Sequence, residues 1–172
     1  MTTAALLISG TVGSGKTTVA EQAAALLANA QVAHAVIDLD WLARAWPPPP
    51  EDRFNLALRL RNLTALSRTF RAAGATRLVL AGVVESRAER SRYEQAAGVP
   101  LRVVRLDVDL TVVRSRLARR HADDPAGLSW HLNRCGELDA VLRAAKVEDV
   151  AVPASAGSPQ EVARAVLDAV TW

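Results

Sequence analysis

A glycine-rich stretch near the N-terminus, GTVGSGKTT at residues 10–18, carries residue types suited to binding phosphate. Gly10, Gly15, Lys16 and Thr17 occupy every fixed position of the pattern G-x-x-x-x-G-K-[ST]. Glycines let the backbone adopt turns that are closed to other residues and bring its N–H groups close to an anion. An apolar run precedes the stretch and a run of helix formers follows it, which is the context that a phosphate-binding loop requires.

Each residue type in this loop has an expected role in binding ATP and Mg²⁺. Lys16 is one of only two lysines in a chain with 21 lysines and arginines, and it supplies a compact charge on a flexible stem. That charge can reach the β- and γ-phosphates, and we expect it to face solvent in the empty site. The hydroxyl of Thr17 is placed to ligand Mg²⁺. We assign nucleotide binding to the whole loop: Gly10, Thr11, Val12, Gly13, Ser14, Gly15, Lys16, Thr17 and Thr18.

Two acids follow the second apolar run, where the letters IDLD place Asp38 and Asp40 at the end of an expected strand. Open α/β sheets bind ligands beyond the carboxyl ends of their strands. If the chain is still extended there, the two side chains point the same way. One could hold Mg²⁺ through water and the other could accept the proton of an attacking hydroxyl, and we favour Asp38 for the metal and Asp40 for the base. The alternative is that an aspartate caps the next helix.

An arginine-rich helical segment runs into a break that contains proline and glycine, at residues 121–127. Arg116, Arg119 and Arg120 are our candidates for stacking on adenine or neutralising the transferred phosphoryl group, with Arg116 and Arg120 as catalytic candidates. The break predicts a lid of about residues 114–134 that closes over ATP. A solvated helix face accounts for some of these arginines.

Weaker candidates could contact an acceptor or the phosphates: Glu85, Arg87, Arg134, Arg44 and Arg61. Three tryptophans could line an acceptor pocket, although core packing is the better interpretation of any single one: Trp41, Trp46 and Trp130. The histidines lack the spacing of a metal site and are assigned no role: His34, His121 and His131.

Strand-like and helix-like segments alternate along the chain. The expected strands cover residues 4–9, 32–38, 76–83, 100–108 and 147–154. The expected long helices cover residues 17–30, 52–74, 85–98, 110–120, 128–145 and 158–170. This alternation predicts a parallel sheet with helices on both faces. The PPPP stretch at residues 47–50 is a stiff connector too short to divide domains, so we expect residues 1–172 to form one domain.

Composition limits the class of protein. Half of the 172 residues are hydrophobic, which argues against disorder. No apolar run approaches the roughly 20 residues of a membrane span, and no basic region precedes the first strand as in a signal peptide. We therefore expect a cytoplasmic protein without a membrane partner, either a monomer or a homodimer. The net charge of +3 suits a nucleotide, and the lack of an aromatic-rich basic patch argues against nucleic-acid binding.

In these residues, the chain resembles the small P-loop kinases of the nucleoside-monophosphate-kinase-like group. The likeness is to the AAA-type ATP-binding family near chloramphenicol phosphotransferase and the gluconate, shikimate and adenylylsulfate kinases. GTVGSGKTTVAEQAA and IDLD are its specific parts, and it covers nearly the whole chain in element order. It implies a P-loop NTPase fold of three layers, α/β/α, with a five-stranded parallel sheet ordered 2-3-1-4-5 and a short lid. It also implies an adenine pocket near residues 153–157, which adds Gly157 to the nucleotide-binding residues.

The acceptor motifs of those kinases are missing from this chain. AGV replaces the glycine triplet that shikimate kinases carry after the third strand, and DLDWLAR lacks the adenylylsulfate kinase pattern. The leading interpretation is ATP-dependent phosphorylation of a hydroxyl on an unidentified small molecule. The alternatives are a nucleotide kinase, or a nucleotide-binding regulator or partner-dependent ATPase without an acceptor. The paired aspartates and the arginine-bearing lid argue against a passive binder, which needs neither.

Overall fold

In a computed structural model, which describes residues 3–172, five parallel strands form one sheet ordered β2-β3-β1-β4-β5. The strands are β1 Ala4–Ser9, β2 His34–Asp38, β3 Arg77–Ala81, β4 Leu101–Asp107 and β5 Val150–Pro153. This order and the parallel pairing confirm the fold expected from the sequence.

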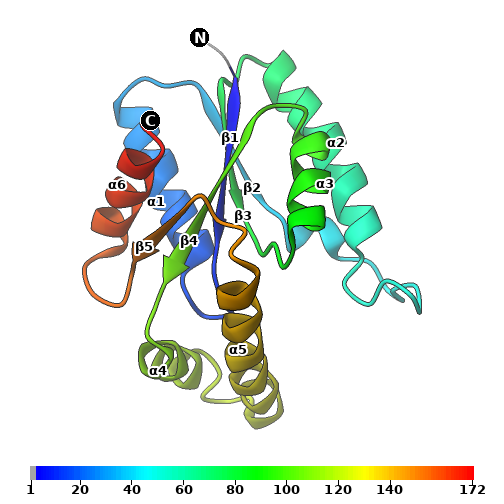
Figure 1. Cartoon of the computed structure of the whole chain (residues 1–172), viewed down its shortest axis with the longest axis vertical. Coiled ribbons are helices and arrows are strands. Elements are labelled where there is room, and N and C mark those ends of the chain that lie inside the picture. The colour runs from blue at the N-terminus through cyan, green and yellow to red at the C-terminus, as the bar shows by residue number, and fades with distance from the viewer. Residues whose placement is uncertain (1–2) are drawn as a thin grey trace.

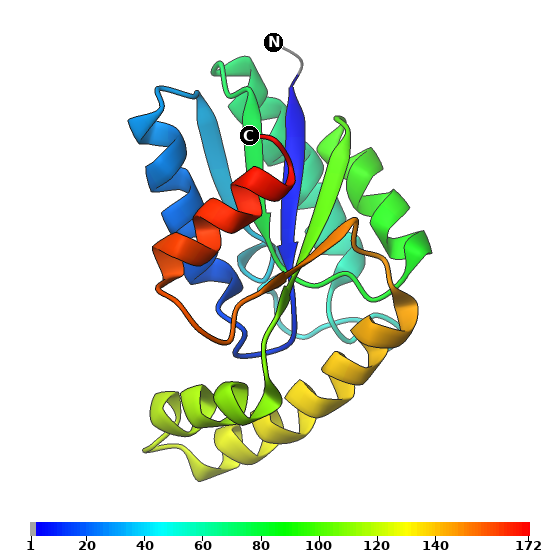
Figure 2. The ribbon, with the colours of Figure 1, turned by 60° about the vertical axis from the view of Figure 1, so that its left-hand side comes forward.

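Helices cover both faces of the sheet (Figure 1). On one face lie α1 Lys16–Asn29 and α6 Pro159–Ala169, and on the other lie α2 Leu56–Ala72 and α3 Arg87–Ala97. Two more helices, α4 Leu110–Arg120 and α5 Pro125–Ala145, lie beyond the carboxyl ends of the strands (Figure 2). A short 3₁₀ turn, η1 Trp41–Ala43, follows β2.

The central strand β1 is buried on both faces, which is why its sequence is almost continuously apolar. Leu6 and Ile8 pack in the core beneath α1 and α6, whereas Ala5 and Leu7 pack in the core beneath α2 and α3. Because side chains alternate between the faces of a strand, this one segment anchors both helical layers and fixes the direction of the loop that follows it.

Helix α2 begins at Leu56, and the expected start at Asp52 is wrong. The carboxylate of Asp52 accepts hydrogen bonds from the N–H groups of Leu56 and Ala57, at 2.7 and 2.8 Å. These bonds lower the pKa of Asp52. The residue is therefore a capping group outside the helix, and Asn55, in the left-handed conformation, forms the junction.

The break between α4 and α5 is shorter than the seven residues expected, because α5 begins at Pro125. Proline suits the first position of a helix, and the Asp124 carboxylate accepts a hydrogen bond from the Gly127 N–H at 2.9 Å. The non-helical part is confined to residues 121–124. That this helical pair acts as a lid stays a prediction.

Candidate nucleotide and phosphoryl-transfer site

The glycine-rich loop joins the end of β1 to the start of α1 in a tight turn. Gly13 and Gly15 have φ angles of 80° and 96°, which strongly favour glycine. A Cβ atom at Gly13 would lie only 3.0 Å from the Cγ of Leu117. The loop therefore packs directly against α4, and the first N–H groups of α1 point toward the position of an anion.

Lys16 folds back onto this loop, so the expectation that it faces solvent is wrong. Its Nζ donates hydrogen bonds to the carbonyl oxygens of Gly10 and Thr11, at 3.1 and 2.9 Å. Burial lowers the pKa of Lys16 to about 8, although the negative charges of Asp40 and Asp38 oppose that shift. The ammonium therefore occupies the concave side of the loop, where phosphate oxygens would offer better partners than carbonyls.

The two aspartates do not point the same way, contrary to the expectation of an extended chain. Strand β2 ends at Asp38, whose Oδ1 accepts the N–H of Asp40 at 2.9 Å and closes a turn. Asp40 is helical, with φ −71° and ψ −30°. The Asp38 Oδ2 accepts a hydrogen bond from the Thr17 hydroxyl at 2.9 Å, whereas the Asp40 carboxylate lies 3.6 Å from Arg59.

Arg59, Tyr93 and Glu89 form a buried polar cluster beside Asp40 that the sequence reasoning missed. The Arg59 Nη1 donates to the Tyr93 hydroxyl at 3.0 Å. Burial raises the pKa of Tyr93 to about 12 and also raises the pKa of Glu89. The Glu89 carboxylate accepts the N–H of Glu85 at 2.6 Å. The cluster thus connects the end of β3 to Asp40.

The helical periodicity of α2 could have predicted the inward position of Arg59. Arg59 lies three residues after Leu56 and four before Leu63, and both leucines pack in the core. An arginine in phase with a buried stripe needs a partner inside the protein. Arg61, which the sequence reasoning named instead, is two positions out of phase and exposed.

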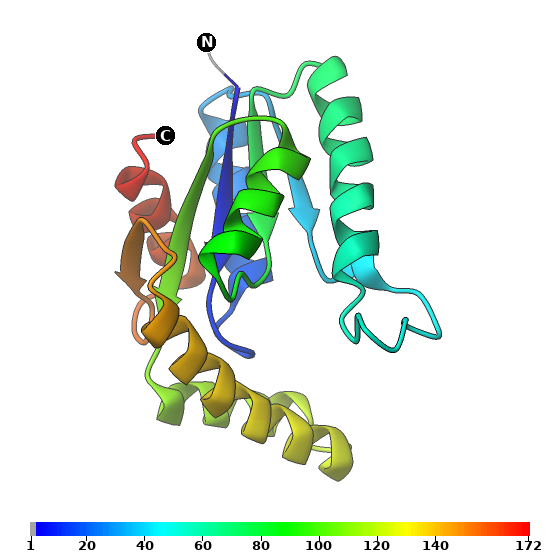
Figure 3. The same cartoon turned by 45° about the vertical axis from the view of Figure 1, so that its right-hand side comes forward.

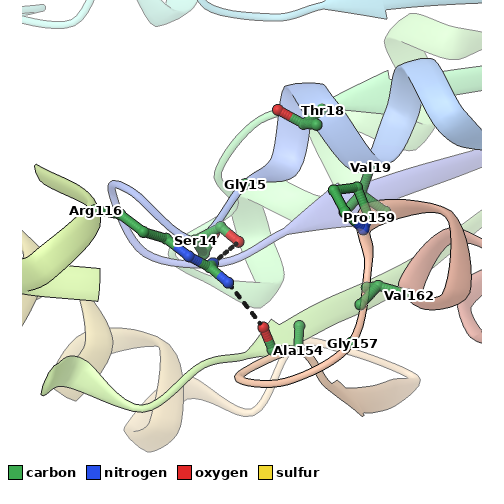
Figure 4. A pocket seen from close by; sticks show the side chains of 9 residues that line it. All are labelled: Ser14, Gly15, Thr18, Val19, Arg116, Ala154, Gly157, Pro159 and Val162. Atoms are coloured by element: carbon green, nitrogen blue, oxygen red, sulfur yellow. Dashed lines mark hydrogen bonds between the residues drawn. The ribbon is translucent and has the colours of Figure 1, made fainter. Parts of the chain in front are cut away.

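A pocket of about 200 Å³ lies on the other side of the loop, between the start of α1 and the turn from β5 to α6 (Figure 4). Arg116 crosses its edge and donates to the carbonyl oxygens of Ser14 and Ala154, at 3.2 and 3.4 Å. Gly157 and Val162 line the opposite wall. The pocket lies where the adenine pocket was expected.

The other arginines of α4 differ in their placement. Arg120 lies one turn beyond Arg116, and its positive charge contributes to lowering the pKa of Lys16. Like Arg119, it is exposed, and its role stays a prediction. Arg119 is exposed, and the structure gives it no contact with the loop.

Arg134 of α5 lies across from the end of β3, where its guanidinium contacts the Glu85 carboxylate at 2.6 Å. It also lies 5.5 Å from the centre of the Phe54 ring. Arg87 is exposed, and Arg44 stacks on the Trp41 ring at 3.8 Å.

The three tryptophans are exposed, so the core-packing interpretation is wrong for each of them. Their exposed fractions are 65% for Trp41, 90% for Trp46 and 46% for Trp130. His121 and His131 stack with their ring centres 4.3 Å apart. Among residues 3–172, no three His, Cys, Asp or Glu side chains are grouped as a metal site.

A family model described as an AAA domain matches residues 6–129, which include the loop, both aspartates and α4. The chain belongs to this AAA domain family. Among curated proteins, none matches the sequence significantly. No helix in the described part of this AAA domain protein combines the length and hydrophobicity of a membrane span.

Solved structures of small P-loop kinases share the fold of this AAA domain protein over nearly their whole length. The APS kinase of Mycobacterium tuberculosis, solved with AMPPNP and APS, is 25% identical, with a TM-score of 0.64 and coverage of 99% of both chains. A gluconokinase from Sinorhizobium meliloti 1021 is 23% identical, with a TM-score of 0.61 and coverage of 98% of this chain and 91% of its own. Shikimate kinase from Acinetobacter baumannii is 17% identical, with a TM-score of 0.60 and coverage of 99% and 94%. The resemblance to small P-loop kinases is confirmed.

Proposed function

We propose that this AAA domain protein is a kinase that transfers the γ-phosphoryl group of ATP to a hydroxyl group of a small molecule. The observation that carries the proposal is the bond from the Thr17 hydroxyl of the loop to the Asp38 carboxylate, which also closes the turn that carries Asp40. The negative charges of both aspartates act on Lys16. The APS kinase, gluconokinase and shikimate kinase that share the fold support the same reaction class.

The nucleotide would lie along the loop, with its base in the pocket between Arg116 and Gly157. The Arg116 guanidinium, already held by two carbonyl oxygens, is positioned to stack on a planar base. The phosphates would then meet the N–H groups at the start of α1 and draw Lys16 away from the carbonyls of Gly10 and Thr11. The remaining loop residues, Val12, Ser14 and Thr18 among them, complete the phosphate cradle.

The Thr17 hydroxyl and the Asp38 carboxylate fit Mg²⁺, because both are hard oxygen donors and lie 2.9 Å apart. Mg²⁺ is commonly held by one or two protein oxygens together with substrate phosphates, so a larger group of acids is not needed. When bound, the ion would neutralise charge on the phosphates.

Asp40 is the proposed general base. Its carboxylate would accept the proton of the acceptor hydroxyl while that oxygen attacks the γ-phosphorus and ADP leaves. The Arg59 guanidinium, 3.6 Å away, would hold the Asp40 carboxylate in place. Arg120, whose positive charge acts on Lys16, would stabilise the negative charge of the transferring group.

A phosphorylation screen tests the proposal directly. The purified protein is incubated with ATP, Mg²⁺ and a metabolite panel, and products are read as a mass increase of one phosphoryl group. ATP turnover is measured in parallel, with and without the panel. Transfer to an acceptor that Lys16→Ala abolishes and Lys146→Ala retains supports a kinase. Slow hydrolysis that no acceptor stimulates would instead support a regulator or an ATPase.

A further inference from the structure

The side chain of Thr11 links the phosphate-binding loop to α5. Its hydroxyl donates a hydrogen bond to the carbonyl oxygen of Cys135 at 2.6 Å, across 124 positions of the sequence. Both residues are buried, with exposed fractions of 3% for Thr11 and 0% for Cys135. The hydroxyl of this loop residue is therefore directed at a helix, and only the backbone of Thr11 is left to contact a phosphate.

The bond from Thr11 fixes where α5 lies and is not needed to make α5 helical. Cys135 is in the interior of the helix, where backbone groups bond to each other along the axis. A carbonyl oxygen has a second lone pair, so it can accept the hydroxyl in addition to its helical partner. What the Thr11 hydroxyl adds is a fixed position of the helix relative to the loop.

The neighbouring residue of α5 makes a contact on the acceptor side of the proposed site. The Arg134 guanidinium donates to the Glu85 carboxylate at 2.6 Å, in the turn between β3 and α3. The N–H of Glu85 donates in turn to the carboxylate of Glu89, which belongs to the buried cluster beside Asp40. Two consecutive residues of one helix thus hold the two sides of the site, Cys135 at the loop and Arg134 at this turn.

Both contacts lie at the point where α5 leaves the body of the protein. The C-terminal end of the helix lies at the sheet, and its N-terminal end projects away together with α4 (Figure 3). The buried residues of α5 are Cys135, Leu138 and Leu142, so burial begins at Cys135. Leu128 and Leu132, nearer the projecting end, are only partly buried. Contacts at this boundary therefore decide where Arg134 lies.

We infer that Thr11 is a positioning residue for phosphoryl transfer, because through the Cys135 carbonyl it holds α5 where Arg134 meets Glu85. This inference rests on the proposed kinase function and adds a residue to it. The carbonyl oxygen of the same Thr11 accepts a hydrogen bond from Lys16 at 2.9 Å. One loop residue therefore contacts both the lysine proposed to bind phosphate and the helix that carries Arg134.

Amide hydrogen exchange of the full chain, read by mass spectrometry, tests the contact without an acceptor. Thr11→Val keeps the shape and removes the hydroxyl, so exchange over residues 134–140 of the free protein should rise by about threefold or more. Thr11→Ser retains a hydroxyl and should retain the slow exchange of the wild type. Thr69→Val is the matched control, since that hydroxyl bonds to the Ala65 carbonyl within its own helix.

A double variant tests whether Thr11 acts through Arg134. Exchange over residues 83–87, the turn that carries Glu85, should rise in Thr11→Val and in Arg134→Met. Combining the two substitutions should raise it no further, because residues that act through one contact are not additive. With an acceptor from the phosphorylation screen, Thr11→Val should lower kcat by about tenfold and change the KM for ATP much less. Thr11→Ser should restore kcat.

Several results would overturn the positioning role. They are exchange over residues 134–140 that Thr11→Val leaves unchanged, a rise that Thr11→Ser shares, or additive effects of the two substitutions on residues 83–87. Each variant is first checked for a cooperative melting transition, and Thr11→Ala replaces Thr11→Val if that variant does not fold.

Failure of this inference is distinguishable from failure of the kinase proposal. A screen that yields no phosphorylated product, together with the expected exchange pattern, would overturn the kinase and keep the contact between the loop and α5. Transfer whose kcat is the same in Thr11→Val and in the wild type would keep the kinase and overturn the positioning role.

Discussion

The Thr17 hydroxyl donates a hydrogen bond to the Asp38 carboxylate at 2.9 Å, which joins the first turn of α1 to the end of β2. Because β3 lies between β1 and β2 in the sheet, this bond reaches past the end of a whole strand. It brings two hard oxygen donors together at the phosphate end of the loop. The contact therefore ties the phosphate-binding loop to the turn that carries Asp40.

Replacing Thr17 by valine should raise the Mg²⁺ requirement, because valine keeps the shape and removes one oxygen donor. Groups that only orient a metal ligand typically contribute about 10- to 100-fold to metal affinity or activity, so the loss of a ligand oxygen should cost at least as much. The measurement is the Mg²⁺ concentration that gives half-maximal phosphoryl transfer. Thr64→Val is the matched control, since that hydroxyl bonds only to the Leu60 carbonyl on α2. Full activity of Thr17→Val in excess EDTA would exclude the metal role.

The buried charge of Lys16 should make the free protein more stable as the pH rises from 8 toward 10. Burial lowers the folded-state pKa to about 8 from an ordinary value of 10.5. Between these pH values the unfolded chain binds more protons than the folded protein. The loss of stability caused by burying the Lys16 charge is therefore fully present below pH 8 and decreases as the pH rises above it. A pKa difference of this size corresponds to up to about 3 kcal/mol.

Urea unfolding of the wild type and Lys16→Met at pH 7 and pH 9.5 measures this effect. The variant should be more stable at pH 7, and its advantage should shrink at pH 9.5. Burial raises the pKa of Tyr93 to about 12, which lowers stability above pH 10, so the comparison stays below that pH. Lys146→Met removes the other lysine and should keep the wild-type trend. A difference that does not change with pH would show that the Lys16 ammonium is not buried.

The sequence predicted the fold well because its signals are local and repeated. The continuous apolar run of β1 and the glycine pattern that follows it each depend on neighbouring residues only. The alternation of strands and helices then left few topologies open. Helix boundaries were less reliable, as at Asp52, because a capping carboxylate looks like an ordinary first residue in the sequence.

The acceptor side was less predictable because its contacts join distant segments. Arg59 meets Tyr93 across 34 positions, and Arg134 meets Glu85 across 49. The exposure of Trp41 depends on how the segment after β2 folds back, which hydrogen bonds from Asn55 and Asn62 decide. The hydrophobic pattern alone favours burial of a tryptophan, so it predicted the exposure of Trp41 incorrectly.

Gly13→Ala should damage both stability and nucleotide binding. The backbone at Gly13 has φ 80°, and the added Cβ would lie 3.0 Å from the Leu117 side chain. We expect a loss of about 1–3 kcal/mol in the free energy of unfolding, from strain and overpacking together. Gly136→Ala is the control, because nothing lies within 4 Å of its added Cβ and alanine favours the helix. That variant should gain about 0.5–1 kcal/mol. Denaturant unfolding and ADP titration of both variants provide the measurements, and equal stability of the two would contradict the packing of the loop against α4.

Asp40→Asn should slow phosphoryl transfer and leave nucleotide binding almost intact. If Asp40 accepts the hydroxyl proton, its loss should cost about 10²- to 10⁴-fold in transfer rate. ATP affinity should be unchanged or slightly higher, because the variant removes a negative charge that acts on Lys16. Calorimetry gives the ATP affinity, and mass detection of the phosphorylated acceptor gives the rate.

Comparing Asp38→Asn with Asp40→Asn distinguishes the proposed metal ligand from the proposed general base. Asp38 bonds to Thr17, whereas Asp40 lies near Arg59, so the two variants should fail in different ways. Excess Mg²⁺ should restore transfer in Asp38→Asn and should not restore it in Asp40→Asn. Asparagine keeps the size and the hydrogen-bonding capacity of aspartate, so a lost turn or cap would cost little and could not mimic the drop. If Mg²⁺ rescues both variants equally, Asp40 belongs with the metal ligands, and the base must be sought at Asp38 or Glu85.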